Sequence, residues 1–220
     1  MKNRYRYYII TFVRRAANPK KVLCRIRLQI EISAALSGFF DDSGSNAVWK
    51  MVKGEEQMER DILLLGDPRL YEISEEIKRE ELDGLRPVIA DLFDCIKGIR
   101  RDYGFGRAIA APQIGVKKRL ICILTDRPYV IINPKLKFVG DEWMELMDDC
   151  MSFPNLLVRV RRCRHCILHY MDENWEEQEM HLDDDMSELI QHEYDHLDGI
   201  LATMRAIDNK SFIMKKETRK

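Results

Sequence analysis

The sequence predicts an α+β fold with mostly antiparallel strands, and three observations support this class. Apolar residues recur at helical spacing over roughly 80–102, and several β-branched segments separated by turns follow them. A second helical pattern covers 184–198, near the end of the chain. Because the strands come in one run between two helices, they do not alternate with helices as a parallel sheet requires.

Length and composition exclude several classes of protein. With 220 residues, the chain is long enough for one domain and an extension. Its 45% hydrophobic and 33% charged residues are typical of a soluble globular protein. A net charge of −1 and the lack of a long apolar run give no reason to expect nucleic acid or membrane as a partner. Six cysteines fit free thiols in a reducing compartment, so we expect a cytoplasmic protein.

Residues 1–57 differ from the remainder, which predicts a boundary near residue 57. The first thirty residues contain nine Lys or Arg and no Asp or Glu, and Ser33–Asn46 is rich in Ser, Gly and Ala. We interpret this segment as a disordered basic extension with a linker, or as translation begun upstream of the natural start. An organelle transit peptide is the alternative. Residues 58–220 form the predicted folded domain.

The elements of this domain follow in order. A short apolar run at 61–69 ends in a Gly-Asp-Pro turn. The helix at 80–102 tolerates Pro87 only because that residue lies near its start. A Gly-rich loop comes next, and β-branched segments then predict strands at 119–124, 129–133, 136–139 and 157–170.

The helix at 184–198 carries a His-Glu-x-x-His pattern. His192 and His196 are four residues apart, so they point to the same side of the helix, with Glu193 beside them. This spacing suits two imidazoles that bind one metal ion, with the carboxylate as a base. Gly199 is a favourable residue just after the helix.

The two faces of this helix differ in polarity. The apolar residues that share the face of the two histidines are Met186, Leu189, Ile190 and Leu197. The polar residues of the other face are Ser187, Glu188, Gln191, Tyr194, Asp195 and Asp198. Two imidazoles and a carboxylate buried without partners would cost several kcal/mol. A metal ion removes that cost, so the pattern predicts a metal site.

A metal held by two imidazoles needs at least one more ligand. Ala202 stands where a His-Glu-x-x-His-x-x-Gly-x-x-His pattern would place a third histidine, so that arrangement is excluded. The upstream candidates are Cys150, Cys163, His165, Cys166, His169 and His181. The Cys-x-x-Cys pair lies inside a predicted strand, where small buried residues are the favoured interpretation. Spacing alone places Cys150, between two predicted strands, only slightly ahead.

Three segments together resemble the motifs of the peptide deformylases. They are Ile109–Gly115, Cys150–Ser152 and Gln191–Gly199, in this order and spacing. The resemblance covers roughly residues 58–208. It implies small, mostly antiparallel sheets packed around the helix that carries His-Glu-x-x-His.

The resemblance also implies a site and a reaction. One divalent metal ion, Fe(II) with Zn(II) as the alternative, would be bound by Cys150, His192 and His196. Glu193 would be the general base and acid. The reaction would remove the formyl group from N-formylmethionyl peptides of newly made proteins. The ribosome near the exit tunnel would then be a partner of the enzyme.

Further residues of the site follow from the same resemblance. The side-chain amide of Gln113 and the backbone N–H of Met151 would stabilise the oxyanion. The expected substrate-binding residues are Gly106, Ala108, Ile109 and Asp149.

Five positions depart from the family pattern. Ala108 and Ile109 replace a common Gly and Leu, while Asp148, Asp149 and Met151 replace Glu, Gly and Leu. The ligands, the base and the glutamine are intact, so we expect the chemistry to survive and substrate choice to change. The charge of Asp149 is expected to disfavour acidic residues after the methionine. Two alternatives remain: a metal amidase for another small N-acyl substrate, and a non-catalytic homologue kept for binding.

Overall fold

The computed structural model describes residues 60–215, and the predicted extension at 1–57 lies outside this range. Short 3-10 turns lie at Pro68–Tyr71, Arg79–Glu81, Ala111–Ile114 and Ala202–Arg205. The helices and strands are α4 (Leu82–Tyr103), β1 (Ala108–Ala110), β2 (Leu120–Leu124), β3 (Pro128–Asp149), β4 (Leu156–Met171), β5 (Glu177–Asp183), α5 (Asp184–Leu197) and β6 (Phe212–Met214).

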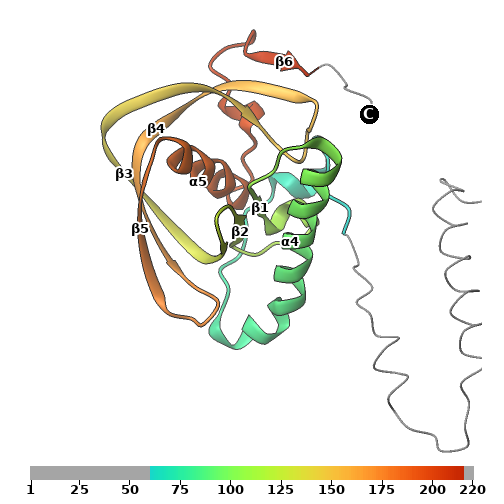
Figure 1. Cartoon of the computed structure of the whole chain (residues 1–220), viewed down its shortest axis with the longest axis vertical. Coiled ribbons are helices and arrows are strands. Elements are labelled where there is room, and N and C mark those ends of the chain that lie inside the picture. Colours follow the sequence, from blue (N-terminus) through green and yellow to red (C-terminus); the bar gives the residue numbers. More distant parts are fainter. Residues whose placement is uncertain (1–59, 216–220) are drawn as a thin grey trace, which may run out of the picture. The chain divides into compact units, whose positions relative to one another are not determined.

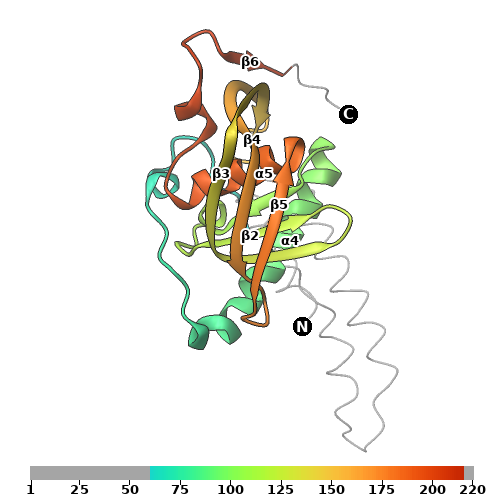
Figure 2. The ribbon, with the colours of Figure 1, turned by 90° about the vertical axis from the view of Figure 1, so that its left-hand side faces the viewer.

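The described strands form one antiparallel sheet. Its order is β1-β2-β3-β4-β5, and β6 pairs with β4 (Figures 1 and 2). The predicted α+β class with antiparallel strands is confirmed, but the expectation of several small sheets is wrong. The reason is the length of β3: its first residues pair with β2 and the remainder pairs with β4, which joins both regions into one sheet.

The strand β3 also corrects the prediction of two separate strands at 129–133 and 136–139. Its register shifts between Ile132 and Lys135 and again between Val139 and Trp143. Asn133 has a φ of 49°, and its side chain exchanges two hydrogen bonds of 2.8 Å with the backbone of Ile77. Such irregularities bend a strand without ending it, so the chain continues as one element.

The helix α4 covers one part of the sheet and confirms the helix predicted at 80–102. Its apolar repeat buries Leu85, Leu92 and Ile96 against the side chains of β1 and β2. The helix ends at Gly104, whose φ of 78° allows its N–H to bond the carbonyl of Arg100 at 3.1 Å. Within residues 60–215, no helix combines the length and the apolar character needed to cross a membrane.

The helix α5 lies in the bend of the sheet, with β3, β4 and β5 curving around it (Figure 1). It agrees with the helix predicted at 184–198. Its polar face, however, is not exposed: Ser187, Glu188, Gln191 and Asp195 are all buried. The sheet encloses this face, and hydrogen bonds replace water there; Gln191, for example, bonds the backbone N–H and carbonyl of Cys163 at 2.9 and 2.8 Å.

The end of α5 fixes its position against the N-terminal part of the domain. Gly199 has a φ of 70°, and a Cβ atom there would lie 2.5 Å from the carbonyl oxygen of Tyr71. The backbone of Ser74 donates a hydrogen bond of 2.8 Å to the carbonyl of Leu197. Only glycine combines this backbone conformation with this close approach.

Candidate metal centre

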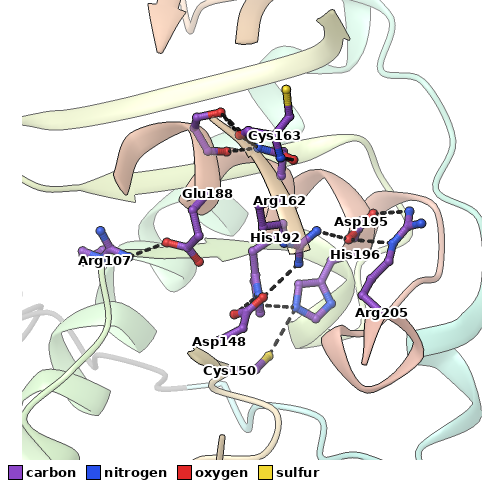
Figure 3. Close-up of polar contacts among 12 residues, drawn as sticks. Arg107, Asp148, Cys150, Arg162, Cys163, Glu188, His192, Asp195, His196 and Arg205 are labelled. Atoms are coloured by element: carbon purple, nitrogen blue, oxygen red, sulfur yellow. Dashed lines mark hydrogen bonds and ion pairs between the residues drawn. The ribbon is translucent and has the colours of Figure 1, made fainter. Parts of the chain in front are cut away.

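Three potential metal ligands converge inside the bend of the sheet. His192 and His196 come from α5, and Cys150 follows the last residue of β3. The Cys150 Sγ lies 3.3 Å from Nε2 of His196, and the two histidine Nε2 atoms are 3.2 Å apart. All three residues are buried, and one ligand atom from each lies within 4.8 Å of the others (Figure 3).

These distances fit a small divalent ion. In a tetrahedral zinc site with Zn–N of about 2.0–2.1 Å and Zn–S of about 2.3 Å, the N···N edge is about 3.3 Å and the S···N edge about 3.6 Å. The observed separations of 3.2 and 3.3 Å are close to both edges. A thiolate with two imidazoles is a donor set that binds zinc or iron. The residues present therefore fit the metal that the sequence implied.

A buried network of charges holds the first histidine in place. Oδ1 of Asp148 lies 2.7 Å from Nδ1 of His192, placed as an ion pair rather than aligned as a hydrogen bond. Arg162 donates a hydrogen bond of 2.9 Å to Oδ2 of Asp148 and bonds Asp195, which also pairs with Arg205 at 2.8 Å (Figure 3). Burial alone raises the pKa of Asp148, but His192 and Arg162 outweigh it and lower the pKa to about 2.

Glu193 and Gln113 border the same centre. Burial raises the pKa of the Glu193 carboxyl to about 7, and its Oε2 has no hydrogen-bond partner among the described residues. Gln113 accepts a hydrogen bond of 2.9 Å from the backbone of Ala110 through Oε1. This contact turns its Nε2 toward the Sγ of Cys150 and the Oγ of Ser152, at 3.4 and 3.3 Å. A carboxyl with a raised pKa and an amide donor thus lie beside the three ligands.

A pocket of about 420 Å³ opens onto these residues. Its lining comprises Gly104, Phe105, Gly106, Arg107, Ala108, Gln113, Asp149, Cys150, Met151, Glu188, Leu189, His192 and Glu193. Ile109 does not belong to the lining, because side chains alternate along β1 and that of Ile109 is fully buried in the core beneath α4. Gly106 has a φ of 119°, and a Cβ there would lie 2.8 Å from the Cε of Met151.

A lysine at the rim of the pocket changes the expected effect of the Asp149 charge on substrates. Its carboxylate lies 2.8 Å from Nζ of Lys215, and that ammonium group also lies 4.3 Å from the ring centre of Phe105. The negative charge that was expected to act on substrates is therefore offset by a neighbouring cation.

Comparison with known proteins identifies the family. The family model described as polypeptide deformylase matches residues 59–212, which include the ligand cluster, Glu193 and Gln113. The chain belongs to the peptide deformylase family. A deformylase of Pseudothermotoga lettingae is 32% identical over 160 residues, which cover 73% of this chain and 90% of the relative. One from Treponema pallidum is 33% identical over 151 residues, covering 68% and 89%.

Solved deformylase structures are also similar. The enzyme from Synechococcus elongatus, in complex with actinonin, matches with a TM-score of 0.63 and 31% identity, covering 69% of this chain and 81% of its own. The enzyme from Legionella pneumophila matches with a TM-score of 0.62 and 29% identity, covering 69% and 88%. The chain is thus an enzyme of this family, a hydrolase that removes formyl groups from newly made peptides.

The other candidate ligands lie outside the cluster. Cys163 and Cys166 are buried in β4 against α5, as expected for small strand residues. The three remaining histidines each pair with a carboxylate and are half-exposed or exposed: His165, His169 and His181.

Sequence reasoning missed several residues around this deformylase site. The sequence predicts Asp148 as one of the substitutions that change substrate choice, whereas the structure buries it behind His192. Arg162, Arg107, Glu188 and Lys215 were not recognised as parts of the site. Their ion pairs join residues 14 to 81 positions apart, a separation that periodicity cannot reveal. A carboxylate two residues before a candidate thiolate ligand was the one available signal, because metal-binding histidines commonly contact a carboxylate.

Proposed function

We propose that this chain hydrolyses the N-formyl group of N-formylmethionyl peptides with one divalent metal ion bound by Cys150, His192 and His196. The observation that carries the proposal is the convergence of these three ligands beside Glu193, at a pocket that Cys150, His192 and Glu193 line. Fe(II) is the proposed metal and Zn(II) the alternative, since the donor set suits both. When bound, the ion would polarise the formyl carbonyl and lower the pKa of water toward neutrality.

Asp148 prepares the ligand set for that ion. Its carboxylate beside Nδ1 of His192 keeps a proton on that nitrogen, which leaves Nε2 free to face Cys150 and His196. Arg162 neutralises the remaining charge of Asp148 inside the domain. The ligands are thus oriented before the metal arrives.

Glu193 is the proposed general base and acid. Burial raises the pKa of its carboxyl to about 7 in the metal-free protein, so this carboxyl can exchange a proton near neutral pH. Its unpaired Oε2 can take a proton from the attacking water and later deliver it to the departing amine. The same carboxyl therefore serves both halves of the hydrolysis.

Gln113 and Met151 are the proposed oxyanion donors. The backbone of Ala110 fixes the amide of Gln113, so its Nε2 points into the site and needs no reorientation when charge develops on the formyl oxygen. Met151 follows the ligand Cys150 directly and lines the same pocket, which supports its backbone N–H as the second donor. One such donor typically contributes about 3 kcal/mol to the transition state.

Small residues line the approach to this centre and favour a small acyl group. Gly106 and Ala108 border the pocket, and a Cβ atom at Gly106 would lie 2.8 Å from the Cε of Met151. A formyl group fits there more easily than larger acyl groups. The proposed partners are formylmethionyl nascent peptides, with the ribosome near the exit tunnel as their source. The proposed location is the cytoplasm, with an organelle as the alternative.

Formyl and acetyl substrates distinguish the two enzymatic hypotheses. We expect the metal-loaded protein to release formate from formyl-Met-Ala-Ser and to leave acetyl-Met-Ala-Ser nearly unchanged. Faster release of acetate than of formate would favour the alternative, a metal amidase for another small N-acyl substrate. Metal binding without release of either acid would favour the non-catalytic homologue.

A further inference from the structure

A pair of charged side chains lines the pocket beside the proposed metal ligands. Nη2 of Arg107 lies 3.0 Å from Oε2 of Glu188 (Figure 3). Nη1 of Arg107 lies 2.6 Å from Oδ2 of Asp185. The side chain of Glu188 is only 11% exposed, whereas that of Asp185 is 80% exposed. Arg107 and Glu188 both belong to the pocket lining.

The pair lies close to where a substrate would react. Glu188 precedes His192 by one helical turn on α5, so both side chains lie on the same side of that helix. Arg107 directly precedes Ala108 of β1, which also lines the pocket. In a formylated peptide, the Cα of the first residue is bonded to the formamide nitrogen. The first side chain is therefore attached next to the reacting group, and we expect it to contact the pocket lining when the formyl group reaches the metal.

The charges of the pocket do not suit an apolar first side chain. A methionine thioether would displace water from Arg107 and Glu188 and give back no strong hydrogen bond. Apolar lining comes only from a few residues, among them Phe105 and Leu189. A side chain that donates hydrogen bonds can replace the lost water at a carboxylate.

The balance of charge gives the direction of the preference. One guanidinium pairs with two carboxylates, Glu188 and Asp185. Arg107 and Glu188, which line the pocket, balance each other, and the exposed Asp185 beside the pocket adds the one excess negative charge. Among the described residues, Arg107 is the single hydrogen-bond partner of the Glu188 carboxylate, which leaves acceptor capacity on that group. Cations and neutral donors complement this cluster, and anions are repelled by it.

We propose that this pocket selects formylated peptides whose first side chain donates hydrogen bonds, such as glutamine or lysine, over methionine. The inference rests on the proposed removal of a formyl group at this site, but it replaces methionine as the preferred first residue of the substrate. The competing explanation is that the ion pair only ties β1 to α5 and does not meet the substrate.

Binding to an inactive variant separates selection from turnover. The test uses the full chain with Glu193→Gln, loaded with zinc, and calorimetry with formyl-X-Ala-Ser peptides in which X is Met, Gln, Lys or Glu. Gln and Met have side chains of similar length, so they differ mainly in hydrogen bonding. We expect the Gln and Lys peptides to bind about tenfold or more tightly than the Met peptide, with Glu the weakest. kcat/KM for formate release by the parent should follow the same order.

Substitution of the pair tests its role directly. Arg107→Ile combined with Glu188→Leu removes both charges together and should shift the Gln-to-Met ratio toward Met by about tenfold or more. Glu188→Gln keeps the size of the side chain and should reduce the preference for Lys, even if the double variant folds poorly. The control removes an exposed ion pair between β3 and β4, with Glu145→Ala and Arg161→Ala, and should leave the ratios unchanged.

The outcomes distinguish the two proposals. Formate release with Met preferred over Gln and Lys would overturn this inference and keep the deformylase function. Tighter binding of the Gln and Lys peptides without formate release from any of them would overturn the function and keep the inference. Equal Gln-to-Met ratios in the parent and the double variant would show that the pair has only a structural role, which also overturns the inference.

Discussion

Replacing Asp148 by asparagine removes the negative charge that His192 and Arg162 share, without changing the shape of the side chain. Asp148 is 2% exposed, 2.7 Å from the imidazole and 2.9 Å from the guanidinium. A neutral amide cannot hold the proton on Nδ1 of His192 as firmly, so Nε2 becomes a poorer metal donor. The guanidinium also loses one of its two buried counterions.

Two magnitudes follow from this geometry. Loss of a carboxylate behind a metal-binding histidine typically lowers metal affinity 10- to 100-fold, or about 1.4–2.7 kcal/mol. Breaking a buried ion pair typically costs about 3–5 kcal/mol; Arg162 keeps Asp195, so we expect the lower end, about 3 kcal/mol. For a domain of this size, that loss lowers the Tm by roughly 6–12 °C.

The adjacent residue provides the control. Asp149 has a side chain that is 40% exposed and pairs with Lys215 at the rim, so Asp149→Asn should cost less than about 1 kcal/mol and leave metal affinity unchanged. Zinc affinity is measured by competition with a chromophoric chelator, and stability by urea unfolding of the metal-free protein. Equal effects of Asp148→Asn and Asp149→Asn on zinc affinity would refute the role given to Asp148.

Three further predictions concern the ligand set, the end of α5 and the extension. Cys150→Ser should sharply lower the metal content after purification, whereas Cys163→Ser should leave it intact; equal losses would move the site to the Cys-x-x-Cys pair. Gly199→Ala should destabilise the fold by more than about 2 kcal/mol, because its Cβ would meet a backbone oxygen at 2.5 Å. Gly140→Ala is the control, because Gly140 also has a φ of 70° but a Cβ atom there would meet nothing within 4 Å. Urea unfolding of this variant should show only the backbone strain of about 1 kcal/mol. Similar losses of stability in both variants would contradict the packing argument. A chain that starts at Met58 should keep its activity, and an inactive or insoluble product would contradict the predicted boundary.

Much of the fold could be predicted from the sequence, because α4, α5 and β4 have long and regular patterns. The shorter strands escaped prediction for physical reasons. Ala108–Ala110 is three residues of a Gly-rich segment, and Glu177–Asp183 is a charged strand at the edge of the sheet. Neither has the β-branched composition that predicts a strand. Pairing with neighbours, not intrinsic propensity, makes them strands.

The site shows the same division between local and long-range information. His192, Glu193 and His196 follow from helical spacing, whereas Cys150 is fixed only by the turn after β3. Helical periodicity separates two faces but cannot tell that both are buried. Glu188 is a separate case: it lies one turn before His192 and therefore on the same side of the helix, so its placement on the opposite polar face was wrong, and it lines the pocket.

The central claim is metal-dependent hydrolysis of a formyl group with Glu193 as the proton carrier. The most direct test measures formate release and metal content together in the parent and in Glu193→Gln, with formyl-Gln-Ala-Ser and formyl-Met-Ala-Ser as substrates. We predict one metal ion per chain in both proteins, and a loss of turnover of about 10²–10⁴-fold in the variant. A variant that keeps its metal and more than about a tenth of the parental kcat would contradict the account.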